Sequence, residues 1–166
     1  QMAQFSTVTG ITDMGETLKG LSAQLSEFRL ATATNLLGSS VLIPGNTARP
    51  SENGEIHGVV DLPSASSTTS ITISDMNGEV IDTIELGPQA SGLVGFTWKN
   101  VPQNILDENA AVRLDAYADT GSGREAVSSS VFAEVLAAST GGASGVRLDV
   151  RDYGEIDAAE VVKFRK

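Results

Sequence analysis

The side chains that most often perform catalysis or bind metals are scarce in this sequence. His57 is the only imidazole, and none of the 166 residues is a cysteine. A serine nucleophile needs a nearby base such as histidine, and an ordinary zinc site needs clustered histidine, cysteine or carboxylate ligands. His57 lies in a predicted strand beside Gly58 and Val59, where packing or simple exposure is the usual role. We therefore expect no catalytic residue, no metal and no cofactor.

The acidic motifs have simpler explanations than chemistry. The segment Asp75-Met76-Asn77-Gly78 resembles the start of a calcium loop. An EF-hand loop continues with glycine at its sixth position and glutamate at its twelfth, where this chain has Val80 and Leu86. Carboxylates such as Asp107 and Glu108 lie in or beside predicted turns. Two acids that converge in a cleft could hydrolyse glycosides, so a carboxylate-based hydrolase stays as a rival interpretation.

Composition narrows the classes of partner and of architecture. The net charge is −10, so the surface repels the phosphates of nucleic acids and anionic membranes, and we expect neither as a partner. Hydrophobic residues make up 40% of the chain and aromatic residues 5%, so the core must consist of Val, Ile, Leu and Ala. The length suits one domain or two small ones. The first residues resemble the interior of a longer chain, so a fragment is expected.

A helical segment is predicted near the start of the chain, within residues 1–37. Its apolar residues alternate at spacings of three and four, which is a heptad stripe. Gly15 and Gly20 weaken this helix, so it needs an apolar partner. The partner is either the adjacent β-region or the same helix in another subunit, and we favour self-association. The stripe consists of Ile11, Met14, Leu18, Leu21, Leu25 and Phe28.

A β-hairpin and a third strand are predicted over residues 69–98. Apolar side chains recur with a period of two, as in half-buried strands. Asn77 and Gly78 are expected to form a type I′ turn, which requires a positive φ at both central residues. Parity places four residues in the core of a β-sandwich, although Phe96 and Trp98 could instead form a platform for stacking sugars. These four are Ile71, Ile73, Phe96 and Trp98.

Two polar links suggest how the β-region is divided. Residues 64–70 are rich in Ser and Thr, and residues 138–145 are rich in Ser and Gly. Between them lies enough chain for a sandwich at 64–138. The flanks, 38–63 and 143–166, are each too short to bury a core alone, so we expect them to pair in one small split barrel.

The chain resembles the flagellar hook-capping proteins, also called basal-body rod modification proteins. The resemblance rests on Ala3-Gln4-Phe5-Ser6 before the helix, on Leu37-Gly38-Ser39-Ser40-Val41, and on the hairpin pattern that ends in Phe96-Thr97-Trp98. The closing run from Gly154 to Phe164 is also similar. The family usually has Trp-Asp-Gly where this chain has Trp98-Lys99-Asn100, so the loop 99–111 is expected to differ.

The resemblance implies a fold, a function and partners. The fold would be mainly β, with a fibronectin-III-like sandwich inserted into a small Tudor-like barrel after an N-terminal amphipathic helix. The protein would be exported to the tip of the growing rod or hook, where a homo-oligomeric cap promotes polymerisation of hook subunits without enzymatic activity. The main alternative is a secreted β-sandwich module for adhesion or carbohydrate binding. That module should expose a row of aromatic rings, which eight aromatic residues can hardly supply.

Overall fold

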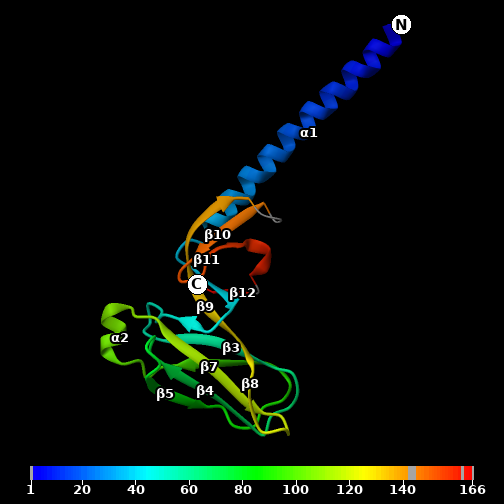
Figure 1. The fold of residues 1–166 in the computed structure, drawn as a ribbon. Coiled ribbons are helices and arrows are strands. Elements are labelled where there is room, and N and C mark those ends of the chain that lie inside the picture. Colours follow the sequence, from blue (N-terminus) through cyan, green and yellow to red (C-terminus); the bar gives the residue numbers. More distant parts are fainter. Residues whose placement is uncertain (1, 142–144, 162, 166) are drawn as a thin grey trace.

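A computed structural model describes residues 2–141, 145–161 and 163–165. Helix α1 (Met2–Thr34) is 33 residues long and extends away from the strands (Figure 1). A turn follows it, in which Gly38 has a φ of +78° and donates its N–H to the carbonyl of Val135 at 3.0 Å. The positive φ favours glycine here, and the hydrogen bond attaches the end of the helical segment to the β-region.

Most of the strands form a sandwich of two facing antiparallel sheets. One face contains β3 (Ile56–Leu62), β6 (Gly92–Trp98) and the first part of β9 (Ser128–Thr140). The other has the order β2-β7-β4-β5, with β8 also on β7. Its strands are β2 (Thr47–Ala48), β4 (Thr68–Ser74), β5 (Val80–Glu85), β7 (Val112–Asp119) and β8 (Arg124–Ala126).

Both sheets contribute side chains to one hydrophobic cluster. Ile71 and Ile73 are fully buried, Trp98 is 2% exposed and Phe96 is 5% exposed, so all four residues that parity placed inward are buried together. The alternation follows from the pleat, because successive side chains of a strand point to opposite faces. Burial of Trp98 also removes the platform that a sugar-stacking site would need.

A second, smaller cluster lies beside the sandwich. It contains Val41, Val135 and Leu148, and Ala33 of α1 packs into it. The strands around it are β1 (Ser40–Pro44), the second part of β9, β10 (Val146–Val150), β11 (Gly154–Asp157) and β12 (Lys163–Arg165), with a 3-10 turn η1 (Ala158–Glu160). β1 pairs with β12, so these parts of the two flanks do meet. The mainly β class is confirmed, whereas the fibronectin-III-like and Tudor-like names stay predictions.

The predicted division into segments is wrong for two stretches. β3 pairs with β6 and β9, and Ile56, Val60 and Leu62 lie in the sandwich cluster. This strand therefore belongs to the sandwich and not to the flank 38–63, because its alternating side chains find their apolar partners there. β9 runs continuously for 13 residues through both clusters, so no boundary falls at residue 138. The start of the expected link at 138–145 belongs to β9, because Ala138, Ser139 and Thr140 pair with Leu148, Arg147 and Val146 of β10; residues 142–144 lie outside the described part.

Two turns also differ from expectation. Of Asn77 and Gly78, only Gly78 has a positive φ, so the predicted type I′ turn is wrong. The carboxylate of Asp75 instead accepts hydrogen bonds from the backbone N–H groups of Glu79 and Asn77, each at 2.9 Å. These bonds, the one from Glu79 foremost, lower the pKa of Asp75. In the region 99–111 the chain forms a short helix, α2 (Gln103–Glu108), which ends at Asn109 with a φ of +47°.

Candidate functional site

The largest exposed apolar surface that the sequence predicted lies on α1. Each of the stripe residues, Ile11, Met14, Leu18, Leu21, Leu25 and Phe28, is between 47% and 69% exposed. Val8, which is 62% exposed, lies one turn before Ile11 and was missed, because the alternation of three and four places the preceding position at residue 7. The stripe thus leaves a row of apolar side chains exposed along α1. We call this surface the α1 stripe.

The alternative, in which α1 packs on the β-region, holds only at the C-terminal end of the helix. There α1 contacts β9 and β10, and Ala33 is 4% exposed. The rest of the helix projects beyond the strands (Figure 1). Among the described residues, no helix combines the length and apolar character required to cross a membrane.

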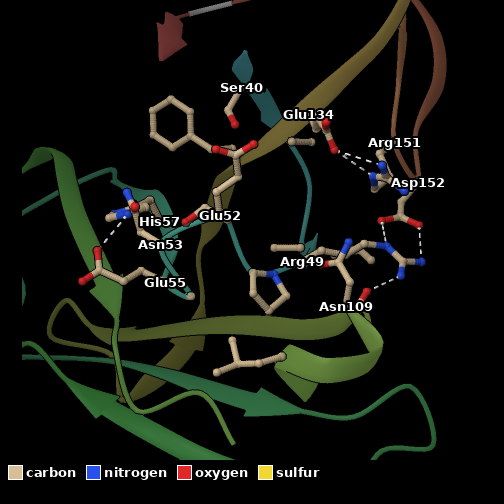
Figure 2. Close-up of a pocket in the computed structure, with 18 of the residues that line it drawn as sticks. Ser40, Arg49, Glu52, Asn53, Glu55, His57, Asn109, Glu134, Arg151 and Asp152 are labelled. Carbon is tan, nitrogen blue, oxygen red and sulfur yellow. Dashed lines mark hydrogen bonds and ion pairs between the residues drawn. The ribbon is translucent and has the colours of Figure 1, made fainter. Parts of the chain in front are cut away.

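A cleft of about 710 Å³ lies where the sandwich meets the smaller unit (Figure 2). Four of its charged side chains form two ion pairs. Arg49 binds both carboxylate oxygens of Asp152, at 2.7 and 2.9 Å, and donates a third bond to the carbonyl of Asn109 at 2.6 Å. The bond to Asp152 raises the pKa of Arg49, which stays charged. Arg151 forms a similar ion pair with Glu134 at 2.9 Å.

Tyr153 completes the contact between the two units. Its hydroxyl donates to the carbonyl of Thr47 at 2.6 Å and accepts the N–H of the same residue at 3.0 Å. Its ring packs against both hydrophobic clusters. Gly45 lies so close that a Cβ added there would be 2.5 Å from the tyrosine hydroxyl oxygen. We call Thr47, Arg49, Asp152 and Tyr153 the junction, since they connect the sandwich to the smaller unit.

The structure does not bring the possible catalytic groups together. His57 lines the cleft but binds Thr97 through Nδ1 at 3.0 Å and Glu55 through Nε2 at 3.2 Å. Asp107 accepts a hydrogen bond from Gln103 at 2.8 Å on α2, and Asp152 is neutralised by Arg49. No group of three potential metal ligands occurs among the described residues. The cleft lies at the contact between the two units, and the Arg49–Asp152 pair on its wall connects them.

Comparison with known proteins identifies the family. Residues 45–104 match the FlgD Ig-like domain. The basal-body rod modification protein FlgD of Escherichia coli K12 is 31% identical over 169 residues, which cover 97% of this chain and 73% of that protein. The chain belongs to the FlgD family. The FlgD of Salmonella typhimurium is 30% identical, with 97% of this chain and 72% of that protein covered.

Solved FlgD structures share the fold. FlgD from Pseudomonas aeruginosa superposes with a TM-score of 0.62 at 21% identity, covering 76% of this chain and 95% of that one. FlgD from Xanthomonas campestris gives 0.60 at 23% identity, covering 81% and 98%, and is described in connection with hook capping essential for flagellar assembly.

Proposed function

We propose that this chain is a scaffold that caps the growing flagellar hook and promotes polymerisation of hook subunits at its tip. Two findings support this function: membership of the FlgD family, and the description of the Xanthomonas relative as a hook-capping protein. The mechanism is steric and templating, so no covalent bond is formed or broken. Reversible interfaces of moderate size suit a cap that must let new subunits enter. The chain acts outside the cell, at the rod or hook tip, after export.

The observation that carries the proposal is the α1 stripe. Transfer of a side chain such as that of Leu21 or Leu25 from water into an apolar contact is favourable by about 1.5–3 kcal/mol of free energy. Several α1 residues that flank the α1 stripe, such as Gly10, Gly15 and Thr17, are small, so a second helix can approach closely. The same helix in neighbouring subunits is therefore the partner that we propose. We propose that the cap consists of several identical subunits arranged with closed symmetry, as in most soluble homo-oligomers.

A pair of variants tests self-association. The double variant Leu21→Glu, Leu25→Glu places two charges in the α1 stripe. It should shift the mass measured by light scattering to that of a monomer. The matched control, Ala23→Glu with Ser26→Glu, adds the same charge to exposed positions of α1 outside the stripe and should keep the parent mass. Trp98 fluorescence reports whether the sandwich stays folded. Equal masses for the two variants would show that the stripe does not hold subunits together.

Hook assembly tests the function itself. Deletion of the gene should give cells without hooks, and the wild-type gene should restore them. The Leu21→Glu, Leu25→Glu variant should fail to restore hooks, whereas the Ala23→Glu, Ser26→Glu control should succeed. Normal hooks in the deletion strain would contradict a capping function for this chain.

A further inference from the structure

Strand β6 is an open edge of the sandwich. It pairs with β3 along its whole length, from Trp98 opposite Ile56 to Gly92 opposite Leu62. No other strand in the described part of the chain pairs with it. About half of the backbone N–H and C=O groups of an edge strand point out of the sheet, where they can accept a further strand.

This edge lacks the features by which proteins usually protect edges. β6 has seven residues, Gly-Leu-Val-Gly-Phe-Thr-Trp, without a charge or a proline, and its register with β3 contains no bulge. By contrast β5, at the edge of the facing sheet, carries Asp82 and Glu85. Its pairing with β4 is also irregular, because the register shifts between Ile73 and Ser74 of β4. Charges, prolines and bulges discourage pairing with other chains. The difference suggests that β6 is kept open for a partner.

The outer face of β6 offers a place for one large side chain. Leu93 is 69% exposed, and a Cβ built on Gly95 would meet no atom within 4 Å. On the inner face of the same sheet, an aromatic ring covers a strand glycine in this way. Gly58 of β3 lies opposite Phe96, whose ring fills the space above it. Cross-strand pairing of an aromatic ring with an edge glycine is a known way to stabilise a sheet.

We propose that β6 binds an extended segment of a hook subunit as an added strand, with a large apolar side chain of that segment over Gly95. The backbone groups of β6 would supply hydrogen bonds, and Leu93 and Gly95 would select the side chains, as in other cases of strand addition. The choice of a hook subunit rests on the function proposed above. A second copy of this chain paired through the same edge fits less well, because it would bring another exposed Asp61 towards the one beside Leu93.

Amide hydrogen exchange of the full chain mixed with purified hook subunits tests the location of the contact. Binding should slow exchange about tenfold or more at alternate residues between Leu93 and Thr97, since only outward N–H groups gain a partner. Protection confined to α1 or to other strands, with β6 unchanged, would overturn the proposal. Slower exchange in β6 would report the added strand itself, because the described pairing leaves this side of β6 without a strand.

Matched lysine variants test the surface. Leu93→Lys with Gly95→Lys should weaken binding of hook subunits about tenfold or more, because lysine on an edge opposes strand addition. Met76→Lys with Val80→Lys adds the same charge at the 63% and 60% exposed residues of the β5 hairpin and should leave binding within about twofold. Should Trp98 fluorescence show that the double β6 variant is unfolded, Leu93→Lys alone is used and the same loss is expected.

The outcomes separate this inference from the proposed function. If the wild-type chain binds hook subunits and the two lysine variants bind equally well, the strand-addition site is wrong while the capping function stands. If the wild-type chain binds no hook subunits and hooks form without it, the function is wrong and the assignment of the partner is wrong with it.

Discussion

The indole N–H of Trp98 donates a hydrogen bond of 2.8 Å to Oδ2 of Asp82. Trp98 ends β6 and Asp82 lies on β5, so the bond connects the edge strands of the two facing sheets. Trp98 is 2% exposed, which leaves its N–H little access to water. A buried donor without an acceptor is costly, so the position of the indole depends on this carboxylate.

Replacement of Asp82 by alanine should therefore destabilise the sandwich. We expect a loss of about 1–3 kcal/mol, since the Trp98 N–H loses its acceptor. Asp82→Asn keeps an oxygen acceptor and should cost less. Urea unfolding followed by Trp98 fluorescence measures the change. Glu85→Ala, at an exposed position on the same strand, is the control; equal losses for Asp82→Ala and Glu85→Ala would contradict the role of the bond.

Two strand glycines should respond oppositely to alanine. A Cβ on Gly58 would be 2.4 Å from the Phe96 ring and 2.8 Å from the carbonyl oxygen of Ser130, so Gly58→Ala should cost about 1–3 kcal/mol. Gly95→Ala meets open space and should be neutral or stabilising by up to roughly 1 kcal/mol. Thermal unfolding of the two variants compares them directly. A stable Gly58→Ala protein would show that β3 and β6 can separate without cost.

Loss of the Tyr153 hydroxyl should weaken the junction. Tyr153→Phe keeps the ring but removes both hydrogen bonds with Thr47, and we expect a loss of about 1–3 kcal/mol. Tyr117→Phe is the control, because that ring lies against the guanidinium of Arg124 at 4.2 Å and is retained in phenylalanine. Chemical denaturation gives both values. A Tyr153→Phe variant as stable as the control would mean that ring packing alone maintains the junction.

The junction should also respond to alkaline pH. Burial raises the pKa of Tyr153 above its ordinary value of about 10, and the nearby Asp152 acts in the same direction. The folded protein thus holds this proton more tightly than the unfolded chain does. The resulting stability is fully present below pH about 10 and is lost as the pH rises through the raised folded-state pKa.

Tyrosinate absorbance measures this effect in the Tyr117→Phe variant, where Tyr153 is the remaining tyrosine. Its midpoint should lie above that of a free tyrosine amide. The difference in stability between wild type and Tyr153→Phe should also narrow above pH about 10. A midpoint at or below that of the free amide would contradict the influence of burial.

Local periodicity in the sequence was sufficient to determine which side chains point inward and which form the α1 stripe. Burial of Ile71, Ile73 and Trp98 follows from a period of two, and the position of the stripe residues on one side of α1 follows from spacings of three and four. That this side of α1 is exposed was decided by the tertiary structure. Both periods are properties of neighbouring residues, so they can be read without knowledge of the fold. The family motifs likewise predicted a mainly β chain after a helix.

Only the tertiary structure decided which strands pair and which polar groups meet. The pattern of Ile56–Leu62 fits a barrel or a sandwich equally well, and the choice depends on its distant partners β6 and β9. Residues 138–145 have the composition of a linker, yet residues 138–140 belong to β9 and pair with β10. Arg49 and Asp152 are 103 positions apart, so no local pattern could predict their ion pair. Such contacts depend on the summed burial and hydrogen bonding of the whole fold, which a periodicity within a few residues does not encode.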